Sequence, residues 1–200
     1  MQASEFLLKS KDPAAWRMHA RALRRSALAL WQEFERTLLA AIRSGATNKC
    51  EPDLTESDEI FASTKLLYGL ALETALKAWI IESDPDSIEV KVTMNGRGEA
   101  IHAELRSLGV ATTQGHNLIA LAEKAGLFGR TFDDVVKTDE DRNALRNICR
   151  HLGEIVIWRG RYPVPLASFE PIRLDPSVPP VAIEHYLRDW LDPVLDKLLN

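Results

Sequence analysis

The segment at residues 139–159 carries side chains whose types and spacing could bind an anion and move a proton. Three arginines recur in it at every fourth position: Arg142, Arg146 and Arg150. Residues four apart on a helix are neighbours, so the three guanidinium groups would form a cationic row. Asn147 and His151 have the same spacing, and Asn147 could therefore orient the imidazole or fix its tautomer.

The same segment is amphipathic when its residues are placed about 100° apart on a helix. The apolar face, expected to be buried, consists of Leu145, Ile148, Leu152 and Ile155, with Cys149 and Val156 at its margin. The expected polar face consists of Arg146, Asn147, Arg150 and Glu154, with His151 at the border between the two faces. Two interpretations stay open. The segment is either a functional cationic patch, or a solvated face on which Glu154 neutralises Arg150 and His151 is structural.

The string from Arg146 to His151, RNICRH, resembles the R-x4-6-H motif of the HEPN superfamily, in which a polar residue commonly follows the arginine. Residues 67–78, LYGLALETALKA, resemble the second helix of that family, which is rich in small residues and carries an embedded Glu and Lys. Residues 116–121, HNLIAL, resemble the segment that often begins its third helix. The three pieces occur in the family's order, and the resemblance covers about residues 14–160.

The resemblance implies a helical fold and, as in many members, a metal-independent endoribonuclease whose site is shared across a dimer. It implies that His151 transfers a proton at the 2′-hydroxyl or the leaving group, while Arg146 stabilises charge on the phosphate. Asn147 would position His151, and Arg142 or Arg150 would hold the flanking backbone. Because Arg146 and His151 are about 140° apart on a straight helix, two copies would have to meet, which predicts a homodimer.

Other interpretations of these motifs remain. A non-catalytic helical module could use the same face to bind a nucleotide, RNA or a partner protein of the antitoxin type. Glu73 and Lys77 could simply form an ion pair within an apolar helix, and Asn117 could cap a helix. Arg97 and His102 also match the motif, but Gly98 follows the arginine in a Gly-rich stretch, so we treat that match as accidental.

Two further basic regions are candidates for anion binding. Arg159 and Arg161 lie beside Trp158 and Tyr162, a mixture found on surfaces that bind single-stranded nucleic acid, although Gly160 could equally end a helix whose aromatic residue fills the core. Near the N-terminus stands a cluster made of Arg17, Arg21, Arg24 and Arg25. We expect the acidic stretch that begins at Glu51 to neutralise it.

Charge and motif content exclude several classes of protein. The net charge of −4 argues against a protein that coats nucleic acid, so an anionic ligand would have to meet the patch from Arg142 to Arg161. Residues 66–81, the most apolar stretch, contain Glu73 and Lys77, which argues against a membrane span. Cys50 and Cys149 lack zinc-site spacing, and no common nucleotide, zinc-protease or serine-hydrolase signature occurs. We expect a cytoplasmic protein with free thiols and without metal or cofactor.

Apolar spacing predicts a mainly α fold, an up-and-down bundle of about five helices with a small irregular or β-hairpin insertion. The helices are expected at residues 13–44, from Thr55 or Ser57 to 82, at 117–125, at 133–158 with a break near Thr138, and at 181–199 with a kink at Pro193.

The insertion lies at residues 88–113. Alternating residues and Asn95-Gly96 suggest a hairpin or an ordered loop, followed by a helical turn that contains Leu105 and Leu108 and ends at Gly109. We expect residues 1–160 to form the bundle, and residues 161–200 to form a Pro-rich extended segment and a final helix packed on the same domain.

Overall fold

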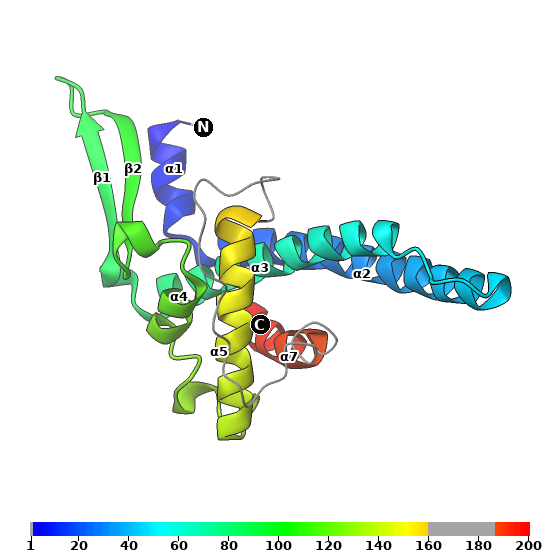
Figure 1. The fold of residues 1–200 in the computed structure, drawn as a ribbon. Coiled ribbons are helices and arrows are strands. Elements are labelled where there is room, and N and C mark those ends of the chain that lie inside the picture. The colour runs from blue at the N-terminus through cyan, green and yellow to red at the C-terminus, as the bar shows by residue number, and fades with distance from the viewer. Residues whose placement is uncertain (1, 160–186) are drawn as a thin grey trace.

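The structure is a computed structural model that describes residues 2–159 and 187–200. It confirms the mainly α fold with a small antiparallel hairpin (Figure 1). The elements in chain order are α1 (Ala3–Ser10), α2 (Pro13–Asn48), α3 (Thr55–Ser83), β1 (Ile88–Met94), β2 (Ala100–Leu108), α4 (Leu118–Lys124), α5 (Asp139–Glu154), the π-helical turn η4 (Ile155–Arg159) and α7 (Leu187–Leu199). Within these described ranges, no helix is long and apolar enough to cross a bilayer.

Helices α2 and α3 lie side by side as a long antiparallel pair, which projects from the rest of the molecule in Figure 1. An aromatic cluster joins them near the base of this arm. Trp31 meets Phe34, Phe61 and Tyr68 edge to face, and the rings of Phe34 and Phe61 stack with centroids 4.6 Å apart. Such pairs add to the burial of apolar area and hold the two helices in register.

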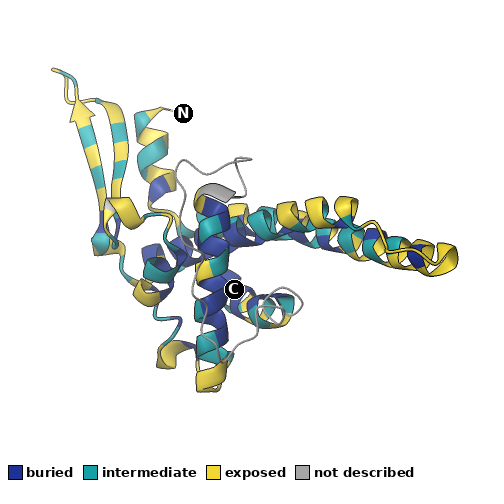
Figure 2. Cartoon of the chain, in the orientation of Figure 1, coloured by how far each residue is buried: buried dark blue, intermediate teal, exposed yellow. Residues whose placement is uncertain are grey.

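The second half of α3 is the centre of the core. Its residues from Ala71 to Ala78 are all buried, and α4, α5 and α7 pack around it. Figure 2 shows the buried residues concentrated where these helices meet, whereas the far end of the arm is largely exposed. At Gly69 the turn η4 approaches α3 closely, because a Cβ there would lie 2.5 Å from Val156 Cγ2.

The insertion is a β-hairpin, and the predicted helical turn around Leu105 and Leu108 is wrong, because both residues belong to β2. Ile88 pairs with Leu108 and Val90 pairs with Leu105, with a register shift between the two pairs. That irregularity adds one residue to β2 and so brings two leucines three positions apart to the same face. The two leucines therefore have the same spacing in the sequence as neighbours on one face of a helix.

Several helix ends differ from the prediction. Gly45 does not end α2, which continues to Asn48 before Lys49 adopts a left-handed conformation (φ 53°). The N-cap of α3 is Leu54 rather than Thr55 or Ser57. The segment 133–138 is a turn and not a first helical piece. The short helix α1 was not expected from the sequence.

Other predicted ends are confirmed. Asn117 caps α4 through its side chain, and α5 begins at Asp139 after a capping box formed by Thr138 and Asp141. Pro193 lies inside α7, which is the described part of the last predicted helix and packs on α3 and α5. Residues 160–186, with the predicted helix end at Gly160 and the Pro-rich segment, lie outside the described residues.

The close approach at Gly69 gives a first testable prediction. Gly69→Ala should lower the free energy of unfolding by about 1–3 kcal/mol, because the new methyl group overlaps Val156. Gly96→Ala is the control, since nothing lies within 4 Å of a Cβ at that loop position. Denaturant unfolding measures both. In the Val156→Ala variant, which removes the overlapping methyl groups, Gly69→Ala should cost less stability than it does in the wild-type protein. Equal costs in the two backgrounds would contradict the proposed clash.

Candidate functional site

The face of α5 that was predicted to be apolar is buried. Leu145, Ile148 and Leu152 are almost completely inaccessible, and His151 is half-buried, at the border as expected. The burial is broader than the predicted stripe, because α3, α4 and α7 all pack against α5. A helix contacted from several sides keeps only a narrow part of its surface for a ligand.

Asn147 is the main departure from the predicted polar face of α5. Its side chain is 0% exposed, so its assignment to the solvated face is wrong. Its Oδ1 accepts a hydrogen bond from Arg150 Nη1 at 3.0 Å, and Arg150 itself is exposed. A buried amide therefore holds an exposed guanidinium in place, next in sequence to His151.

The predicted arginine row does not act as one patch. Arg142 donates to Asp133 Oδ1 at 2.7 Å and to Asp139 Oδ1 at 2.9 Å, and hydrogen bonding to these carboxylates raises its pKa. The guanidinium carbon of Arg146 lies 4.5 Å from the ring centroid of Phe128. Arg142 is thus largely neutralised, whereas stacking leaves the N–H groups at the edge of Arg146 for a ligand.

The remaining predicted contacts are those of Arg159 and Arg161. Arg161 lies outside the described residues, and so does the side chain of Arg159. The part of the candidate site that the structure describes therefore consists of Arg146, Arg150 and His151, with Asn147 beneath them. This arrangement offers guanidinium donors for an oxyanion and one imidazole, whose Nε2 atom is buried.

Two of the four arginines in the basic cluster at the start of α2 are paired with carboxylates, but not with those of the acidic stretch that follows α2. Arg17 pairs with Glu82 at the end of α3, and Arg24 pairs with Asp192 and Asp196 of α7. Arg21 donates to the carbonyl of Leu199. These contacts join α2 to α3 and α7, and they make the cluster part of the fold.

Sequence reasoning missed a second group of titratable side chains. Glu73 and Lys77 are both buried in α3, with Lys77 Nζ 2.5 Å from Glu73 Oε1. His116, just before α4, places Nδ1 2.9 Å from the same oxygen. The predicted ion pair of Glu73 and Lys77 is confirmed, but the approach of His116 depends on how α4 packs on α3, which no local pattern reports.

A cavity of about 220 Å³ opens beside this group, at the base of the hairpin. Its lining is formed by Lys77, Leu105, Arg106, Ser107, Leu108, Val110, Ala111, Gly115 and His116. Two of the three titratable residues therefore face the same space. This makes the cavity a candidate binding site separate from the surface of α5.

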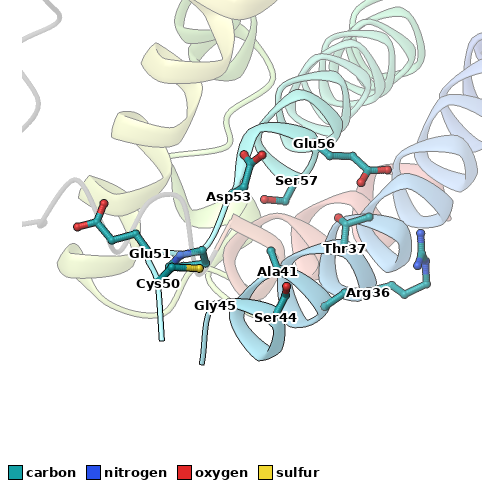
Figure 3. A pocket seen from close by; sticks show the side chains of 12 residues that line it. Arg36, Thr37, Ala41, Ser44, Gly45, Cys50, Glu51, Asp53, Glu56 and Ser57 are labelled. Atoms are coloured by element: carbon teal, nitrogen blue, oxygen red, sulfur yellow. The ribbon is translucent and has the colours of Figure 1, made fainter. Parts of the chain in front are cut away.

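A larger pocket, of about 360 Å³, lies between α2 and α3 toward the far end of the arm (Figure 3). Its polar side chains are engaged locally. Asp53 accepts from the amide of Thr55, Ser57 donates to the carbonyl of Leu54, and Arg36 pairs with Glu33. These contacts shape the helix ends, so the pocket belongs to the connection between the two helices.

Comparisons with known protein families, with curated proteins and with solved structures found no match to this chain.

The buried ion pair gives a prediction about stability. Lys77→Met should lower the free energy of unfolding by about 3–5 kcal/mol, because it leaves the Glu73 carboxylate buried without its cation. Glu73→Gln/Lys77→Met removes both charges and should restore most of the loss. Lys9→Met, in the exposed pair with Glu5 at the same spacing, should change nothing measurable. Equal losses in the single and double variants would contradict this account.

The two cysteines give a prediction about reactivity. Burial raises the pKa of the Cys149 thiol to about 12, whereas Cys50 is exposed and free. Since the thiolate is the reactive form, iodoacetamide at pH 8 should label Cys50 alone in the folded protein and both residues after denaturation. Mass spectrometry of the peptides measures the labelling. Rapid labelling of native Cys149 would show that α5 is not packed as described.

Proposed function

We propose that this chain is a HEPN-like RNA-binding protein that cleaves RNA without a metal ion, at a site formed by the α5 helices of two copies. The observation that carries the proposal is the hydrogen bond from Arg150 to the buried side chain of Asn147. It fixes the exposed guanidinium of the residue that precedes the half-buried His151 in the sequence. A fixed cation beside a titratable imidazole suits a reaction at a phosphodiester.

In the proposed reaction, His151 takes the proton of a ribose 2′-hydroxyl as the 2′-oxygen attacks the adjacent phosphorus. The bond from phosphorus to the 5′-oxygen breaks, and that oxygen leaves with a proton from an acid, for which the second copy's imidazole is available. The products are a 2′,3′-cyclic phosphate and a 5′-hydroxyl. Arg146 and Arg150 stabilise the charge that develops on the phosphoryl oxygens.

The need for two copies follows from the geometry of one helix. His151 is five positions after Arg146, which places the directions of the two side chains about 140° apart on the helix. The contact between Arg146 and Phe128 also draws that guanidinium toward the loop after α4. Two facing copies of α5 would let the arginine of one copy act with the histidine of the other.

A second candidate function is binding without cleavage, with RNA, a nucleotide or an antitoxin-type partner protein as the ligand. The pairing of Arg142 with two aspartates favours it, because a neutralised arginine supplies little charge stabilisation to a transition state. The cytoplasm is our proposed location for either function, and the free thiol of the exposed Cys50 supports a reducing compartment.

Cleavage of labelled single-stranded RNA in EDTA tests the proposal. The wild-type protein should cleave, and His151→Ala should reduce the rate at least about 100-fold, because it removes the proton-transfer group. His102→Ala is a matched control, since this exposed strand histidine belongs to the accidental second match of the motif. The folding of each variant is checked by circular dichroism.

Two outcomes would overturn cleavage at α5. One is full activity of His151→Ala, and the other is the absence of cleavage of several RNAs by a folded wild-type dimer. In the second case, RNA binding that weakens with salt and with Arg150→Gln would establish the non-catalytic candidate.

A further inference from the structure

The ion pair of Glu73 and Lys77 is costly to keep in the core, and the exposed His116 contacts it from the protein surface. Both members of the ion pair are at least nine-tenths buried, and desolvating two charges offsets most of the attraction between them. Within the described residues, Glu73 Oε2 is also buried without a hydrogen-bond donor. A buried acceptor without a donor destabilises the folded state. Stability alone therefore does not account for this arrangement.

The hydrogen bonds define which atoms are left for a ligand. An ionised carboxylate only accepts, so His116 Nδ1 carries the proton directed at Glu73 Oε1. The other ring nitrogen, Nε2, is then the one available outside the group, and it donates to an anion when the ring carries both protons. Lys77 donates one N–H to the same carboxylate oxygen. An ammonium has three N–H groups, so within the described residues two of them are left for a ligand.

The cavity next to these atoms has the charge and size for a small anion. Lys77, Arg106 and His116 line it, and none of its nine lining residues is acidic. Glu73 contacts Lys77 and His116 but is not itself part of the lining. A volume of about 220 Å³ is below the range for a drug-sized ligand and suits a single ionic group.

We propose that this cavity binds a phosphate group, held by the ammonium of Lys77 and the imidazolium form of His116, with Glu73 as the positioning residue. The carboxylate orients both donors by accepting one hydrogen bond from each. Arg106, at the exposed side of the cavity, supplies a guanidinium of the kind that pairs well with phosphate oxygens. The inference does not depend on RNA cleavage at α5.

The charges near the site set the expected strength of binding. The carboxylate of Glu73 offsets the charge of Lys77, and Glu104 lies 2.9 Å from Arg106. The remaining positive potential is therefore modest, and we expect the affinity for inorganic phosphate to be in the millimolar range. Charge-assisted hydrogen bonds are the stronger class, so removal of the donors should change that affinity measurably.

Titration with inorganic phosphate, followed by calorimetry and by the NMR signals of the histidine rings, tests the proposal. Saturable binding that shifts the His116 signals is expected for the wild-type protein. His116→Ala should weaken binding about tenfold or more, which is the loss of one charge-assisted hydrogen bond. His102→Ala, on the exposed strand β2, should bind phosphate as the wild type does.

A second variant separates binding from folding. Glu73→Gln/Lys77→Met keeps the side-chain volumes and removes the buried charges, so it should fold well and yet lose phosphate binding. Retained binding in this folded variant would overturn the proposal, and so would the absence of saturable binding to the wild-type protein.

Titrations with acetate and with a nucleoside 5′-monophosphate identify the class of ligand that the cavity binds. Acetate that binds as well as phosphate would overturn the assignment to phosphate. Tighter binding of the monophosphate, with the same dependence on His116 and on the ion pair, would identify the terminal phosphate of a nucleotide as the group that the cavity accepts. Equal affinities for both phosphates would support the free ion.

Discussion

The burial of α3 is the constraint on which the rest of the structure depends. From Ala71 to Ala78 this helix has no exposed face, so every neighbour must cover part of it. Small residues make such coverage feasible, because helix α5 and the turn η4 can approach at Gly69. The same burial encloses Glu73 and Lys77, whose charges then need each other and His116.

Some arginines of this chain stabilise the fold through ion pairs, and others belong to the candidate site on α5. Arg17 and Arg24 connect α2 to α3 and α7 through carboxylates, and Arg142 is held by two aspartates. Charges outside such pairs contribute most of the long-range attraction of a phosphate, whereas a paired cation contributes mainly through direct hydrogen bonds. The net charge of −4 is therefore compatible with anion binding at a few places, and it is incompatible with binding spread over the whole surface.

The sequence predicts features that arise from neighbouring residues and fails where distant segments meet. Periodicity located α2, α3 and α5, and cap chemistry located Asn117 and Thr138. The helical wheel could not place Asn147, because its burial depends on the helices packed around α5 and not on α5 itself. The irregularity that brings Leu105 and Leu108 to one face is likewise decided by pairing with β1.

The two candidate sites use different residues, but both lie near the contact between α4 and α5. Leu118, two residues after His116, lies 3.9 Å from the position that a Cβ of Gly153 would occupy, and Gly153 is two residues after His151. Helix α4 therefore contacts α5 at the level of one site and begins at the other. The packing of Leu118 against Gly153 therefore helps to fix the position of His116, which precedes α4, relative to α5.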